Sequence, residues 1–139
     1  MGVIIMIMYY LKLYLISLFT FLIIDFLWLG LLARRFYGKY LGFLLSNKPI
    51  WIAAIIFYLL FVAGVLIFVV LPSLHTGSTK KVLLLGALFG LVTYGTYDLT
   101  NLALVKNWPW IVTVVDMCWG TFLSVIVSYV GFLTGKFLG

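Results

Sequence analysis

Residues 110–135 read WIVTVVDMCWGTFLSVIVSYVGFLTG, an apolar run with a single charged residue, Asp116. As a helix, such a run needs about 20 residues to cross the roughly 30 Å of hydrocarbon in a bilayer. Similar runs occupy residues 13–33, 49–71 and 82–105, and residues 1–12 extend the first of them upstream. The sequence therefore predicts an all-α fold, with one transmembrane domain built as a bundle of four spanning helices.

The composition of the whole chain favours the same fold class. Of its 139 residues, 66% are hydrophobic and only 9% are charged. Too few polar residues remain to form a water-facing surface, so we expect the lipid bilayer to be the main partner. The net charge of +6 comes from basic residues near the ends of the apolar runs. There they anchor helices to lipid headgroups, and no nucleic-acid partner is expected.

Four spans place both termini and the second connecting segment on one face of the membrane. The first and third connecting segments then lie on the opposite face. The face of the first and third segments carries the basic residues Arg34, Arg35, Lys39, Lys48 and Lys106. The face of the termini carries one fewer: Lys12, Lys80, Lys81 and Lys136. The positive-inside rule therefore favours a cytoplasmic location for the first and third segments, by a margin of one residue.

All three acidic residues, Asp25, Asp98 and Asp116, lie inside apolar runs. A charge at membrane depth costs from roughly 2.5 to more than 10 kcal/mol, so such residues usually face a protein interior or a wet cavity. Each acid lies within nine residues of the end of its run on the side of the first and third connecting segments. At about 1.5 Å per helical residue, the three carboxyls share one level, and we expect them to surround one polar cavity.

Polar and aromatic side chains accompany each acid at helical spacing. Residues three or four apart share a helix face. Trp28 follows Asp25 in this way, and Trp119 follows Asp116. The candidate ligand-binding or proton-binding residues are Asp25, Asp98, Asp116, Asn101, Tyr94, Tyr97, Trp28 and Trp119.

Three segments carry a resemblance to a known family: DFLWLG at residues 25–30, YDLTNLA at 97–103 and VDMCWG at 115–120. From about Tyr10 onward, the chain resembles the small bacterial membrane proteins catalogued as domain of unknown function 2177. The resemblance implies a multi-pass protein of the bacterial inner membrane. It implies no activity.

The first functional hypothesis is binding or proton-coupled transport of a small cationic or amphipathic solute. A cation can exchange with a proton on a buried carboxyl, and Trp and Tyr faces attract organic cations. Asp98 is the expected central ligand, because Tyr94 and Asn101 flank it on one helix face. Asp25 and Asp116 would then tune its affinity for protons.

Three alternatives stay open, and a homo-oligomer remains an option under each. The acids could serve only to pack the bundle, through interhelical hydrogen bonds worth about 0.6 kcal/mol each. Carboxylates with the amide oxygen of Asn101 would suit a hard cation such as Mg²⁺, Ca²⁺ or Na⁺, although no pattern identifies a particular metal or cofactor. A lipid-modifying enzyme could use paired carboxylates. The sequence favours a non-enzymatic role, because His75 and Cys118 form no nucleophile–base pair.

Overall fold

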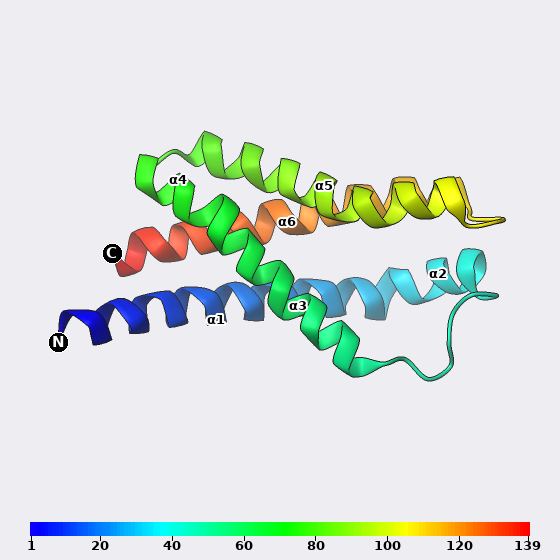
Figure 1. The fold of residues 1–139 in the computed structure, drawn as a ribbon, viewed down its shortest axis with the longest axis horizontal. Helices are drawn as coiled ribbons and strands as arrows, with labels where there is room; N and C mark the ends of the chain where they lie inside the picture. The colour runs from blue at the N-terminus through cyan, green and yellow to red at the C-terminus, as the bar shows by residue number, and fades with distance from the viewer.

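The computed structural model covers residues 1–139 and consists of long helices joined by short connections (Figure 1). Two of the four membrane-length helices contain a π-helical turn, which divides them into named parts. In chain order the elements are α1 (Gly2–Trp28), η1 (Leu29–Ala33), α2 (Arg34–Leu41), α3 (Trp51–Val65), η2 (Leu66–Val70), α4 (Leu71–Thr76), α5 (Thr79–Leu104) and α6 (Trp110–Leu138).

All four helices are long and apolar enough to cross a membrane, which confirms the predicted four-helix membrane bundle. The two termini lie at the same end of the bundle (Figure 1). The first helix is longer than predicted, because it starts at Gly2 and continues to Leu41 rather than ending near residue 33. Arg34 and Arg35 therefore lie within this helix and do not mark its end.

The π turn of the second helix explains how that helix continues through a proline. The sequence favours a helix end at Pro72, because proline lacks an N–H and its ring clashes with the carbonyl four residues earlier. In the structure the wider turn of η2 ends at Val70, two residues before Pro72, and the helix continues to Thr76. It ends at Gly77, whose φ of 63° is the left-handed conformation that suits glycine after a helix.

The third helix begins with a side-chain cap, a role for which Ser78 and Thr79 both have a suitable residue type. The Ser78 hydroxyl accepts a hydrogen bond from the Lys81 backbone N–H at 3.2 Å. This bond satisfies one of the amide groups that the first turn of a helix leaves unpaired. A short connection around Pro109 then reverses the chain into α6.

The α5–α6 pair is the most extensive helix contact in the molecule. Small residues allow the two helices to approach closely, as is common in membranes. A Cβ atom placed on Gly90 of α5 would lie 2.6 Å from the Gly120 carbonyl oxygen of α6. Gly86 meets Ser128 one turn further along the same interface. This pair carries Asp98 and Asp116, so its tight packing fixes their relative positions.

The other two helices pack on this pair less evenly. Buried side chains of α1, α3 and α6, including Phe21, Val62 and Leu123, form one hydrophobic cluster. The second helix crosses α1 and diverges from α5 toward its own N-terminal end (Figure 1). It is η2, more than α3, that contacts α5. The first turns of α3 therefore stand away from α5.

Candidate functional site

Asp98 on α5 and Asp116 on α6 form a carboxyl pair across the helix interface. Asp98 has 0% exposed surface, and neither of its carboxylate oxygens meets a hydrogen-bond donor. Its carboxyl interacts directly with that of Asp116, both through charge and through a potential hydrogen bond. Two ionised carboxylates have no donor between them, whereas a proton on either one supplies it. The geometry therefore suits a proton shared by the pair.

Tyr37 of α2 contacts the Asp116 carboxyl from the first helix. Its hydroxyl donates a hydrogen bond to Asp116 Oδ1, which links the first helix to the fourth. The sequence interpretation did not include Tyr37. A signal was present, because Phe36, Tyr37, Tyr40 and Leu41 follow each other at helical spacing among basic residues.

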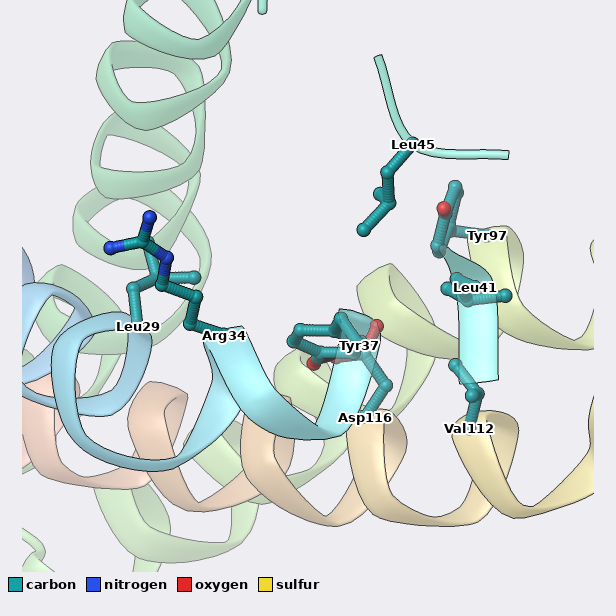
Figure 2. Close-up of a pocket in the computed structure, with 8 residues that line it drawn as sticks. All are labelled: Leu29, Arg34, Tyr37, Leu41, Leu45, Tyr97, Val112 and Asp116. Carbon is teal, nitrogen blue, oxygen red and sulfur yellow. Dashed lines mark hydrogen bonds between the residues drawn. The ribbon is translucent and has the colours of Figure 1, made fainter. Parts of the chain in front are cut away.

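The π turn η1 separates Asp25 from Tyr37 within the first helix. A π turn holds more residues than an α turn, so it changes the direction in which the following residues face, and such turns are frequent at functional sites. The turn places Tyr37 on the side of α2 that faces α6, beside Asp116, while Arg34 lies at another wall of the first cavity (Figure 2). The structure thus uses the irregular turn to present the hydroxyl that binds Asp116.

Asp25 on α1 is also buried, with 8% of its surface exposed. Its carboxyl lies beside the Tyr58 hydroxyl and the Trp119 indole and is close enough to Asp116 for their charges to interact. Asp98 also interacts with the Asp116 carboxyl. Asp116 is therefore the neighbour that the other two acids share.

Two cavities meet at Asp116. The first has a volume of about 470 Å³ and lies between the first helix and the α5–α6 pair (Figure 2). The second has a volume of about 390 Å³ and extends toward α3. The first is lined by Leu29, Arg34, Tyr37, Leu41, Leu45, Tyr97, Val112 and Asp116. The second is lined by Phe57, Thr93, Tyr94, Tyr97 and Asp116.

The arrangement of the acids differs from the expectation of one polar cavity lined by all three. Only Asp116 lines the two cavities, whose walls are mainly apolar and aromatic, while Asp25 and Asp98 are buried away from them. The count of residues along a helix gives the depth of a side chain. Its direction depends on how the helix is rotated, and one residue changes that rotation by about 100°.

The predicted aromatic residues divide into two groups. Tyr97 lines both cavities, and Tyr94 lines the second while its ring packs against Gly120. Trp28 and Trp119 instead stack on each other, with ring centroids 4.4 Å apart and planes 9° from parallel. Their indole N–H groups have no hydrogen-bond partner. The two tryptophans line neither cavity, so in the structure they join α1 to α6.

The remaining polar candidates lie outside the cavities. Asn101 is half-buried one turn beyond Asp98 and lies beside Tyr97. No group of three His, Cys, Asp or Glu side chains comes together as a possible set of metal ligands. His75 and Cys118 are exposed on different helices.

The apolar helices and the buried acids define a polytopic membrane protein, which contacts the lipid bilayer along its exposed apolar surface. Residues 10–133 match a family model described as "Predicted membrane protein (DUF2177)", and the chain belongs to that family. Searches of curated proteins and of solved structures found no match to this chain.

Proposed function

We propose that this protein, in the inner membrane of a bacterium, binds a small cationic or amphipathic solute at Asp116 as a step of proton-coupled transport. One observation carries the proposal. Asp116 lines two cavities while its carboxyl is paired with the buried, otherwise unpartnered carboxyl of Asp98. A carboxyl in this position can hold a cation from the cavity or share a proton with its neighbour.

The exchange follows from charge balance. When the pair shares one proton, the two carboxyls carry one negative charge between them. A singly charged cation that binds Asp116 takes over the role of that proton, because two adjacent uncompensated carboxylates repel each other strongly. Binding should therefore release about one proton per cation, and acid should weaken binding because protons compete for the same carboxyl.

The second cavity supports transport in addition to binding. Both cavities share Asp116 and Tyr97, but they extend toward different helices. A solute at Asp116 therefore has space on two sides of the carboxyl. Transport requires a site that can be reached from more than one direction, and this arrangement is suited to that requirement.

Binding of benzylammonium to the purified protein tests the proposal. Calorimetry in two buffers with different heats of ionisation counts the protons released by the wild-type protein. Asp98→Asn should still bind the cation but release no proton, and Asp116→Asn should not bind it. Asp25→Asn is the comparison for loss of a buried acid that lines neither cavity. It should still bind the cation and release a proton, with an affinity changed only through the charge of Asp25 near Asp116.

Two results would contradict the proposal. Wild-type protein that binds benzylammonium equally well in acid and at neutral pH would exclude exchange with a proton. An Asp116→Asn protein that binds like wild type would place the site elsewhere. The pH dependence of benzylammonium binding by the wild-type protein requires no substitution. It can therefore contradict the proposal even if a variant does not fold. Uptake of the cation into proteoliposomes under a pH gradient then separates transport from binding.

A structural role for the acids is the second candidate, and one observation favours it. The Tyr37–Asp116 hydrogen bond and the Trp28–Trp119 stack both fasten the first helix to α6. If packing is the whole role, Asp98→Asn and Asp116→Asn will change thermal stability, and the wild-type protein will bind no cation.

A further inference from the structure

The first cavity carries one basic and one acidic side chain on otherwise apolar or aromatic walls. We infer that its ligand is the headgroup of an aminophospholipid, with the ammonium at Asp116 and the phosphate at Arg34. This inference rests on the proposed function, since it specifies the solute that the same site would bind. Figure 2 shows Arg34 on one side of the cavity with its guanidinium directed away from Asp116 and Tyr37, so a ligand that contacts both charges requires another rotamer of the Arg34 side chain.

The two charges call for a ligand that carries both signs. A simple ammonium ion would satisfy Asp116 but leave the Arg34 guanidinium without an anion. A simple phosphate would satisfy Arg34, since Arg matches phosphate oxygens with several donors, but it would approach the Asp116 carboxyl without a compensating cation. A zwitterion with an ammonium and a phosphate a few bonds apart complements both groups at once.

The floor of the cavity favours a primary ammonium over a quaternary one. Tyr37 already donates to Asp116 Oδ1, so the second carboxylate oxygen is the acceptor that remains for a ligand. A primary ammonium offers three N–H donors, and a choline headgroup offers none. The expected headgroup is therefore phosphoethanolamine and not phosphocholine.

The remaining walls favour a lipid over the free headgroup. Leu29, Leu41, Leu45 and Val112 surround the charged groups of the first cavity. The second cavity continues from Asp116 and Tyr97 toward Phe57, along the side where α3 diverges from α5 (Figure 1). A hydrocarbon chain attached to the headgroup would fill this apolar space and contact its walls, which a free headgroup would leave without partner atoms.

Calorimetry on the purified protein with five probes tests the inference. The probes are lysophosphatidylethanolamine, lysophosphatidylcholine, lysophosphatidylglycerol, free phosphoethanolamine and benzylammonium. Wild type should bind lysophosphatidylethanolamine about tenfold more tightly than benzylammonium, the gain expected of one additional hydrogen-bonded charge pair. The other two lysolipids and free phosphoethanolamine should bind more weakly than lysophosphatidylethanolamine.

A matched pair of variants isolates the arginine. Arg34→Gln should lower the affinity for lysophosphatidylethanolamine about tenfold and leave benzylammonium binding unchanged. Arg35→Gln removes the neighbouring charge, which does not line the cavity, and should change neither. If both variants lower lysophosphatidylethanolamine binding equally, Arg34 has no specific role and the inference is wrong.

The remaining outcomes separate this inference from the proposed function. Equal binding of the choline and ethanolamine lysolipids would overturn the assignment of a primary ammonium. Equal binding of free phosphoethanolamine would overturn the lipid and leave a soluble zwitterion. In each of these cases the proposed function stands if benzylammonium binding still depends on Asp116. Failure of wild type to bind benzylammonium contradicts the proposed function itself.

Discussion

Gly90→Ala tests whether the close approach of α5 and α6 sets the geometry of the acid pair. The new Cβ would lie 2.6 Å from the Gly120 carbonyl oxygen and 2.7 Å from both Thr121 Cα and Ser124 Cβ. These are backbone atoms or atoms fixed to the backbone, so no change of side-chain rotamer relieves the overlap. The helices would have to separate by about 0.8 Å to restore ordinary van der Waals contact.

The expected loss of stability comes from two opposing effects. Overpacking of this kind costs about 1–3 kcal/mol. Alanine in place of glycine within a helix contributes up to about 1 kcal/mol in the other direction. We expect a net loss of about 1–2 kcal/mol in the free energy of unfolding. The separation should also weaken the coupling of Asp98 to Asp116, so that fewer protons are released when benzylammonium binds.

Thermal unfolding in detergent, followed by tryptophan fluorescence, measures the stability change. Gly86→Ala is the control, because it makes the same substitution on the same interface with the same gain in helix propensity. Its Cβ would lie 3.1 Å from Ser128 Oγ and 3.3 Å from Val125 Cα, which requires much smaller adjustments. If Gly90→Ala unfolds at the same temperature as Gly86→Ala, the two helices are not in the close contact described here.

Three further predictions concern other parts of the molecule. Tyr37→Phe removes the hydrogen-bond donor to Asp116 and should lower the free energy of unfolding by about 1–3 kcal/mol, measured by thermal unfolding. Tyr40→Phe is the control on the same helix, and an equal loss of stability in both variants would contradict the role of this bond. Insertion of one alanine between Ala33 and Arg34 should rotate α2 by about 100° and reduce benzylammonium binding, because Tyr37 would no longer face Asp116; unchanged binding would show that the direction of Tyr37 does not matter for the site. Ser78→Ala removes the N-terminal cap of α5 and should lower stability by about 1 kcal/mol, without any effect on ligand binding.

Features set by short stretches of sequence could be predicted. The four spans follow from the length and hydrophobicity of the apolar runs, and the cap at Ser78 follows from residue type at a helix start. The presence of Asp25, Asp98 and Asp116 within three of these spans also requires only the sequence. Each of these features depends on neighbouring residues or on the number of residues between two points.

Features that depend on how helices rotate against each other could not be predicted. No local pattern marks the π turns at 29–33 and 66–70, yet the first of them sets the direction of Tyr37. The sequence favoured Asp98 as the ligand because of its polar neighbours, whereas the structure buries Asp98 and turns Asp116 toward the cavities. That difference arises from packing between distant segments, which residue spacing along one helix does not contain.

The stacked indoles of Trp28 and Trp119 give the protein an intrinsic spectroscopic signal that depends on the distance between α1 and α6. Two parallel aromatic rings with centroids 4.4 Å apart couple their electronic transitions, and the coupling decays steeply as the rings part or tilt. The resulting circular dichroism signal would report the separation of α1 from α6 beside Asp25, without any attached dye. Changes in the distance between α1 and α6 could then be followed in real time in unlabelled protein.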